Sequence, residues 1–260
     1  MLKSIWVSRN LVSELVRRDL KIRYLGSLLG GVWSILNPLL QLTVYTVVFS
    51  VFLGQHFRQG SSSGQFALFL FAALLPWLSF QETLNRSSRT FIDHSQLIKK
   101  TRFSLPTLPL SLTISTFLHQ CVGTLLLFVV LVFTGEIDFS TVWIWPLVGF
   151  LQMILVFGLA LMLACATVLI RDISQALGVV LLVLFWMTPI VYSRDRAGEL
   201  DWILGLNPLT HLIELHRFAL FGQPVPSSEG LLYLLLVSFS ALVLGAIVHF
   251  LTRKLIVDLV

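Results

Sequence analysis

The sequence RSSRTFIDHSQLIKKTRFSLP, residues Arg86–Pro106, is the one long polar break in the first half of an otherwise apolar chain. Its single acid is Asp93, and its basic residues are Arg86, Arg89, Lys99, Lys100 and Arg102. The middle of the stretch, FIDHSQLI, has enough apolar residues for a short amphipathic helix. We therefore predict a basic loop over residues 85–106 that carries a short helix, and the composition of the whole chain indicates what surrounds it.

Composition predicts a membrane protein. Hydrophobic residues make up 56% of the chain and charged residues only 12%, with a mean hydropathy of +0.88. Soluble domains have roughly 45–50% apolar and about 25% charged residues. Because so few charges cannot cover a soluble surface of this size, most of the surface must face lipid. The net charge of +5 does not indicate nucleic-acid binding, because the basic residues cluster beside apolar runs.

Six apolar runs are each long enough to cross most or all of a hydrocarbon core of roughly 30 Å, at about 1.5 Å per residue. They are residues 31–53, 66–84, 107–133, 142–170, 176–192 and 231–251. We predict an all-α integral membrane protein of six transmembrane helices, with residues 1–260 as one transmembrane domain. Pro189 predicts a break at the end of the fifth run. The first run starts too late and is too long for a cleavable signal peptide.

The distribution of charge predicts the orientation of these helices. With six spans, the N-terminus, the loops at 85–106 and 171–175, and the C-terminus share one side of the membrane. The other side holds only four of the 18 Lys and Arg residues, Arg58, Arg194, Arg196 and Arg217. Because Lys and Arg accumulate in cytoplasmic loops, both termini are predicted to be cytoplasmic.

Residues 1–25 are polar and basic, and they precede the first run. On a helical wheel Leu11, Val12, Leu15 and Val16 share one half with Leu20, whereas most polar residues lie on the other half. Asp19 interrupts the apolar half. The pattern predicts an interfacial helix that lies on an anionic leaflet, with an ordinary solvated helix as the alternative.

Residues 193–230 separate the fifth and sixth runs and contain two short apolar clusters. Asn207-Pro208 is typical of a helix start, and Gly222 is typical of a helix end. Each cluster is too short to span, so we predict two short re-entrant helices that dip in from the outer face. A seventh span and a solvated surface hairpin are the alternatives. The polar residues here argue against a seventh span: Asp201, His211, Glu214, His216 and Arg217.

No motif in the chain predicts bond chemistry. None of the lysines follows a glycine, so a G-x-x-x-x-G-K-[ST] phosphate loop is missing, and if ATP drives this chain, another polypeptide must supply the site. His211, Glu214 and His216 lack the spacing of a metal site, and pairing of Glu214 with Arg217 or His211 explains them better. No charged residue lies in the middle of a run, which argues against an ion-coupled transporter.

Five stretches of the sequence together resemble one known family. They are RRDLKIRYLGSLLGGVWSILNPLLQL (17–42), SQLIKKTRFSLPTLPLS (95–111), VLIRDISQAL (168–177), MTPIVYS (187–193) and NPLTHLIELHR (207–217). In this order they resemble the permease subunit of polysaccharide-exporting ABC transporters of the type-2 class, which move O-antigen, capsule or teichoic acid chains. The likeness covers nearly the whole chain. Phe103-Ser104 stands where the family often has Phe-Pro, which concerns only the local turn.

This resemblance implies a permease that is not an enzyme and that forms the membrane half of an ATP-driven exporter. Such an exporter would move lipid-linked polysaccharide from the cytoplasm across the bacterial inner membrane. Two copies of the chain would form a homodimer, and each copy would bind one ATP-binding subunit. That subunit would hold the ATP and Mg, so this chain itself is expected to carry no cofactor and no metal.

The resemblance also implies roles for particular residues. Residues 91–100 match the family's coupling helix, which docks in a cleft of the ATP-binding subunit, and Arg171-Asp172 matches a second contact. The coupling residues are Phe91, Ile92, Asp93, His94, Leu97, Ile98, Lys99 and Lys100. Residues 194–222 match the outer gate, with Trp202, Asn207, Pro208, His211, Glu214 and Arg217. The cations that would attract the lipid phosphate, or only anchor the first helix, are Arg9, Arg17, Arg18, Lys21 and Arg23.

Aromatic residues are abundant, with 20 Phe, 7 Trp and 4 Tyr. They fit either a packed core or a channel between two copies, lined mainly by spans one, two and five, in which sugar rings slide over aromatic faces. The candidates for channel lining are Trp33, Tyr45, Phe49, Phe185 and Trp186.

Two rival functions stay open at this stage. One is an exporter of the same architecture for a small amphiphile such as a drug or a lipid. A continuous aromatic-lined channel in the dimer would favour the polysaccharide exporter over this rival. The other is a membrane-embedded glycosyltransferase or acyltransferase. That activity requires a carboxylate or histidine cluster at one membrane face, and no convincing cluster is visible in the sequence.

Overall fold

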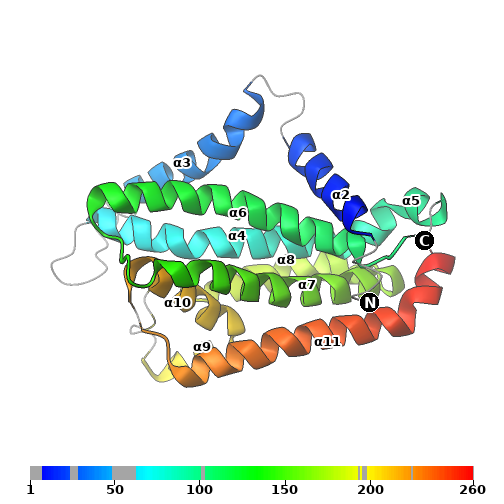
Figure 1. Ribbon diagram of the computed structural model, residues 1–260. Coiled ribbons are helices and arrows are strands. Elements are labelled where there is room, and N and C mark those ends of the chain that lie inside the picture. The colour runs from blue at the N-terminus through cyan, green and yellow to red at the C-terminus, as the bar shows by residue number, and fades with distance from the viewer. Residues whose placement is uncertain are drawn as a thin grey trace.

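Figure 1 shows the computed structural model of the chain, an elongated bundle of helices. The structure describes residues 8–23, 29–48, 63–100, 103–192, 194, 198–223 and 225–259. Within these described residues, four helices are long and apolar enough to cross a membrane, judged by length and composition. They are α4 (Ser63–Asp93), α6 (Thr107–Thr134), α7 (Trp145–Leu169) and α11 (Ser228–Leu259). The described residues contain no strand, so the all-helical prediction is confirmed.

The first and fifth apolar runs form shorter helices. They are α3 (Trp33–Thr46) and α8 (Asp172–Trp186), of 14 and 15 residues. At about 1.5 Å per residue each is roughly 21–23 Å long, which is less than a hydrocarbon core. The expected break near Pro189 is confirmed, because α8 ends at Trp186. Six complete spans and the orientation of the termini therefore stay predictions.

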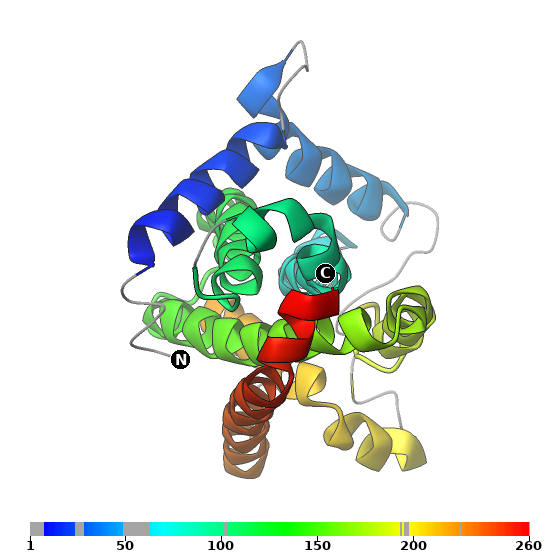
Figure 2. The same ribbon diagram turned by 90° about the vertical axis from the view of Figure 1, so that its right-hand side faces the viewer.

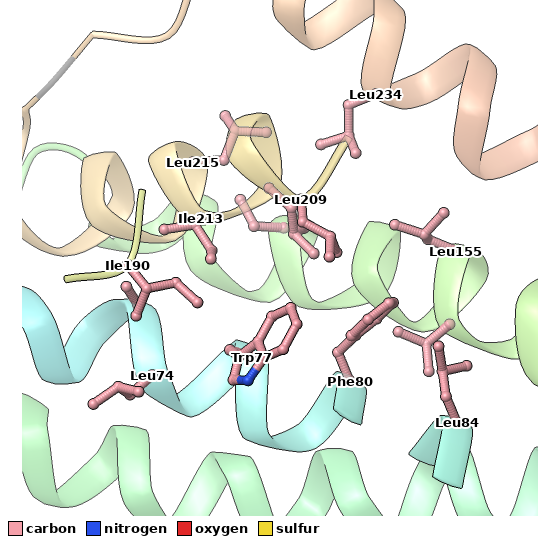
Figure 3. Close-up of a cluster of buried hydrophobic side chains, with 14 of the residues drawn as sticks. Leu74, Trp77, Phe80, Leu84, Leu155, Ile190, Leu209, Ile213, Leu215 and Leu234 are labelled. Carbon is pink, nitrogen blue, oxygen red and sulfur yellow. The ribbon is translucent and has the colours of Figure 1, made fainter. Parts of the chain in front are cut away.

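Helix α4 is the central helix of the bundle, as the end-on view in Figure 2 shows. It is mostly buried, whereas α11 is mostly exposed. Figure 3 shows Trp77 and Phe80 of α4 facing Leu155 of α7 and the apolar side chains of α10. In a membrane, helices associate through close packing of their side chains rather than through exclusion of water. This dense contact therefore holds α4, α7 and α10 together.

Helices α7 and α11 cross at a point where only small residues fit. A Cβ built on Gly158 would lie 2.5 Å from the backbone carbon of Ala241, and one on Gly245 would lie 2.5 Å from the carbonyl oxygen of Gly158. Small residues let two transmembrane helices approach until their backbones touch. The crossing therefore depends on Gly158 and Gly245.

The basic stretch, Arg86–Pro106, is more helical than predicted. Residues 86–93 do not form a loop but continue α4, which ends at Asp93. After a turn at His94, the short helix α5 (Ser95–Lys100) follows. The helix continues because one of its faces stays buried, through Ser87, Thr90 and Phe91, while polar residues occupy the other faces. Arg102 lies outside the described residues.

The remaining helices lie at the ends and edge of the bundle. Helix α2 (Arg9–Ile22) packs against α6 through buried Val12 and Val16. Helices α9 (Asp201–Leu206) and α10 (Pro208–Phe221) follow α8. Figure 1 shows α5 and the end of α11 at one end of the bundle, and α9 and α10 at the other. We refer to these as the α5 end and the α10 end.

Candidate functional site

The predicted coupling segment uses its apolar side chains inside the chain. Phe91 is fully buried and Ile98 is 7% exposed. Both belong to a cluster with Phe157 and Leu161 of α7 and Ile256 of α11. Phe91 is therefore packed inside the single chain, and its predicted place on the docking surface stays a prediction.

The outward surface of the coupling segment is polar. Lys99, Lys100 and Asp93 are exposed, whereas the other predicted contact residues, Ile92, His94 and Leu97, are half-buried. The His94 ring nitrogen Nδ1 lies 2.9 Å from the carbonyl oxygen of Thr90, a contact that supports the turn between α4 and α5. The surface that remains for a partner is thus a patch of charge rather than an apolar knob.

Arg171 and Asp172 lie at the junction of α7 and α8, and both are exposed. Asp172 occupies the first turn of α8, where a negative charge is stabilised by the helix dipole. The preceding residues Ala164 and Cys165 pack in the same cluster as Phe91, so this junction lies at the α5 end. The structure therefore brings the two predicted partner contacts to the same end of the molecule.

Helix α2 is tied to α4 and α6 by a network of ion pairs. The Asp19 carboxylate pairs with Arg86, with one Nη1–Oδ2 distance of 3.1 Å, and accepts a hydrogen bond of 2.5 Å from Ser115 Oγ. Arg23 Nη2 lies 2.5 Å from Glu82 Oε1, and Arg86 Nη1 lies 3.0 Å from the same oxygen. We call these five residues the α2 network. They explain why Asp19 stands on the apolar half of α2.

The α2 network keeps Asp19 ionised. Burial alone would raise the pKa of this carboxyl, but hydrogen bonds from Arg86 and Ser115 and the nearby guanidinium charges bring the pKa below its ordinary value. Asp19 is therefore a charged anchor for α2 across the physiological range of pH.

The structure divides the five α2 cations that the sequence interpretation treated as one set. Arg23 is half-buried and forms a two-point ion pair with Glu82. The other four lie on the exposed face of the helix, namely Arg9, Arg17, Arg18 and Lys21. Arg23 is therefore engaged with Glu82, while Arg17, Arg18 and Lys21 stay exposed on α2.

At the α10 end, Asn207 and Arg217 form hydrogen bonds to the segment that follows α8. Asn207 Nδ2 donates to the carbonyl oxygen of Met187 at 3.2 Å and to Thr188 Oγ1 at 2.8 Å. Its Oδ1 accepts from the backbone N–H of Leu209 at 3.0 Å, which caps α10 at the expected position, with Pro208 as the first residue of the helix.

Arg217 is the buried centre of this arrangement. Its Nη1 and Nη2 donate to the carbonyl oxygens of Pro189 and Ile190 at 2.7 and 2.8 Å, and its Nε donates to that of Phe69 at 3.2 Å. The guanidinium carbon lies 3.7 Å from the centroid of the Phe69 ring. These bonds satisfy carbonyl groups at the broken end of α8, which a membrane interior would otherwise leave unpaired.

His211, Glu214 and His216 do not come together as a metal site. Glu214 pairs with His211 at 3.7 Å and with Arg194 at 3.4 Å, whereas His216 Nε2 lies 2.8 Å from Gln152 Oε1. Among the described residues, no group of three His, Cys, Asp or Glu side chains could hold a metal ion. The predicted pairing of Glu214 with His211 is confirmed.

Arg194 also links Glu214 of α10 to the start of α9. It forms an ion pair with Asp201, and the hydrogen bond from Arg194 lowers the pKa of that carboxyl. The neighbouring Trp202 is 65% exposed, as expected for a side chain at a membrane surface or an interface.

The aromatic candidates divide between core and surface. Phe185 packs edge-on against Trp77, with ring centroids 5.5 Å apart, and against Trp186 at 5.3 Å. Trp186 is 60% exposed, and Trp33 is half-buried. The side chain of Tyr45 and the whole of Phe49 lie outside the described residues.

Two polar features were missed by the sequence reading. The first is a chain of three buried side chains across α6, α7 and α10. Gln120 and Gln152 exchange hydrogen bonds of 2.8 and 3.1 Å, and His216 lies 2.8 Å from Gln152. The signal that could have revealed it is the presence of two glutamines inside otherwise apolar runs.

The second missed feature is a pocket of about 540 Å³ between α3, α4 and α6. Most of its wall is polar but neutral. It is lined by Asn37, Pro38, Gln41, Leu75, Leu78, Ser79, Gln81, Glu82, Asn85, Thr116, His119 and Gln120. The pocket thus adjoins the α2 network through Glu82, and the buried polar chain through Gln120.

Comparison with known proteins places this geometry in a family. The chain is 28% identical over 242 residues to the O-antigen export system permease protein RfbA of Myxococcus xanthus, covering 92% of this chain and 90% of that protein. It is 30% identical over 239 residues to the protein of the same name from Klebsiella pneumoniae, covering 91% and 89%. It is 25% identical over 250 residues to the polysialic acid transport protein KpsM of Escherichia coli, covering 92% of each.

The family profile named "ABC-2 type transporter" matches residues 10–221, which run from the start of α2 to the end of α10. The match therefore contains the α2 network, helix α5 and the Arg217 contacts within one family sequence. It agrees with the membrane-crossing helices and with the family that the sequence motifs resemble. The chain belongs to the ABC-2 type transporter family.

Proposed function

We propose that this chain is the transmembrane subunit of an ATP-driven exporter that moves lipid-linked polysaccharide from the cytoplasm across the bacterial inner membrane. The observation that carries the proposal is the likeness to two O-antigen export permeases over about nine-tenths of the chain. ABC-2 permeases work with an ATP-binding subunit. We infer a homodimer with two such subunits, each of which would hold ATP and Mg.

The α5 end is the surface that would receive the ATP-binding subunits. It gathers the cations Lys99, Lys100 and Arg171, and basic residues of a membrane protein accumulate on the cytoplasmic side. Because the apolar side chains of α5 are buried in the chain, partner binding there would depend on charge pairing at the rim of a cleft. This is a refinement of the expectation that an apolar helix docks.

The exposed face of α2 would receive the lipid-linked cargo. Arg17, Arg18 and Lys21 form a row of accessible cations on a helix whose apolar face is already packed on α6. A diphosphate headgroup carries the charge that such a row attracts. Arg23 would serve to hold α2 in place rather than to bind the cargo.

The polymer would pass between two copies of the chain, along α3, α4 and α8. The exposed Trp186 on α8 supports this path, since an aromatic face gives grip to a sliding sugar without a deep binding well. The α9–α10 hairpin would form the outer gate, with its position fixed by Asn207 and Arg217.

A capsule chain is a second candidate cargo, favoured by the likeness to the polysialic acid transport protein. One experiment tests the proposal for both cargoes. Removal of this chain from its host should abolish surface polysaccharide and leave the polymer inside the cell, and restoring the chain should reverse both effects. Normal surface polymer without the chain would contradict the proposal. Sugar transfer from a lipid-linked donor by the purified chain alone would instead indicate an enzyme.

A further inference from the structure

We propose that the pocket between α3, α4 and α6 binds a short, uncharged, hydroxyl-rich segment of carbohydrate. The proposal deepens the proposed function, on which it rests, because it assigns the sugar part of the cargo a site within each single copy of the chain. The site lies apart from the aromatic surface of α8, and nothing in the sequence reading pointed to it.

The first argument is the hydrogen-bonding capacity of the wall. Among the described residues, the side-chain amides of Asn37, Gln41 and Asn85 form no hydrogen bond to the protein. These three amides are exposed, so their donors and acceptors are available to a ligand in the pocket. An amide offers both donors and an acceptor, and so does each pair of adjacent sugar hydroxyls.

The second argument is charge. Glu82 is the one carboxylate in the lining, and Arg23 and Arg86 neutralise it from the α2 side. No Lys or Arg lines the pocket. Apart from the imidazole of His119, the pocket therefore presents no cation to a phosphate and no free anion to an amine, which favours a neutral ligand.

The third argument is size and shape. About 540 Å³ falls within the range of roughly 300–1,000 Å³ that is usual for small-molecule sites. It suits a few sugar units and not a whole polymer. Leu75, Leu78 and Pro38 add apolar surface beside the amides, as the C–H faces of a sugar ring require.

The fourth argument is that part of the wall is held in place before a ligand arrives. Gln81 accepts a hydrogen bond of 3.0 Å from Trp77 Nε1, and Gln120 is fixed by its two bonds to Gln152. A wall fixed in advance loses less entropy when a ligand binds. Since Gln152 also contacts His216 of α10, the pocket and the outer hairpin share one chain of hydrogen bonds.

A photo-crosslinking experiment tests the proposal directly. The residue p-benzoylphenylalanine is placed at Gln41, or for comparison at Leu244, which is exposed on α11. Cells that make the polymer and the ATP-binding subunit are irradiated, and the denatured chain is stained for carbohydrate with a periodate reagent. We expect a carbohydrate adduct at position 41 only, and only in cells that can make the polymer.

The alternative adducts each overturn the proposal. Phospholipid alone at position 41 would mean that the pocket faces bulk lipid, and a second copy of the chain alone would mean that it is a dimer contact. No adduct in cells that still export would place the sugar elsewhere while the proposed function stands. If polymer reaches the surface in cells that lack the chain, the proposed function fails, whatever the crosslink shows.

A substitution experiment gives a second, independent measurement. The double variant Asn37→Leu/Gln41→Leu removes two exposed amides, and Thr43→Val is the matched control on α3, because its hydroxyl bonds within its own helix at 2.8 Å. We expect the double variant to lower the export rate by about fivefold to tenfold, with unchanged folded yield and unchanged binding of the ATP-binding subunit. Export equal to that of the control would overturn the proposal.

Discussion

In the α2 network the helices are joined by partly exposed ion pairs between side chains, whereas at the α10 end a buried arginine bonds to backbone carbonyl groups. Arg86 has a side chain that is 34% exposed and shares two acids, Asp19 and Glu82. Arg217 is 3% exposed and has three carbonyl partners. Both arrangements tie three or more segments together, but they differ in how readily they can be exchanged.

Partly exposed ion pairs are weak and screened by salt, and their members can take new partners. A buried cation surrounded by carbonyls cannot leave its partners without large cost. We therefore expect the α2 network to rearrange during transport, while the contact between α8 and α10 stays fixed. Substitutions at the two places should show this difference as a difference in stability.

The largest effect is expected for Arg217→Met. This change leaves the carbonyl groups of Pro189 and Ile190 without their donor and removes a second donor from that of Phe69, and it should lower the free energy of unfolding by about 3–5 kcal/mol. Thermal unfolding of the purified protein in detergent measures the loss. Arg217→Lys is the control, because it keeps the charge but not the fork of donors, and it should recover only part of the stability. An unchanged unfolding midpoint for Arg217→Met would show that these carbonyls need no partner.

The second-largest effect is expected at the crossing of α7 and α11. Gly158→Leu places a side chain against the backbone of α11 at Ala241, so α7 and α11 must separate, at a cost of about 1–3 kcal/mol. Gly178→Leu is the matched control, since a Cβ at Gly178 meets nothing within 4 Å. Thermal unfolding compares the two variants. Equal midpoints would mean that the crossing tolerates a wider spacing.

A smaller effect is expected in the α2 network. Asp19→Asn removes the charge that pairs with Arg86, and it should cost about 1–2 kcal/mol at low salt and less at high salt. Glu14→Gln on the exposed face of α2 is the control and should change little. Equal losses for the two variants at low salt would show that the network adds no stability.

The pH dependence of the same network follows from the lowered pKa of Asp19. A carboxyl whose pKa is lower in the folded chain stabilises the fold fully above its unfolded pKa of about 3.9. This contribution is lost as the pH falls through the lower folded pKa. The stability difference between the native protein and Asp19→Asn should therefore stay constant from pH 7 to pH 5, and disappear only in strong acid. A difference that already shrinks at pH 6 would contradict the pKa direction.

The long helices could be predicted from the sequence where an apolar run indicates a buried or lipid-facing segment. Residues 107–133 and 142–170 correspond closely to α6 and α7, whereas α11 (Ser228–Leu259) contains residues 231–251 and continues beyond them. The basic stretch was read wrongly because hydropathy reports contact with lipid, and α4 continues on packing contacts such as Phe91 after its hydropathy falls. The ends of α10 were predictable, since Asn207-Pro208 and Gly222 act locally.

The contacts between helices could not be predicted, because they depend on how each helix is rotated about its axis. Asp19 looked like an error in an amphipathic pattern until α4 placed Arg86 beside it. Gln120 and Gln152 are 32 residues apart, and no local pattern relates them. The lining of the pocket is distributed over three helices in the same way. Local chemistry thus predicted the ends of elements, and only the packed fold revealed which polar groups meet.

The smallest effect on stability, and a large one on transport, is expected for Lys99→Glu/Lys100→Glu. Both side chains are exposed at the α5 end, so charge reversal should change the free energy of unfolding by only about 0.5 kcal/mol. If these lysines pair with acids of the ATP-binding subunit, reversal should abolish co-purification of that subunit or polymer export. Arg253→Glu/Lys254→Glu, at two adjacent exposed cations near the end of α11, is the control with the same change in charge. Full export by the double variant would mean that the lysines only hold the segment against anionic lipid, and that the ATP-binding subunit contacts the chain elsewhere.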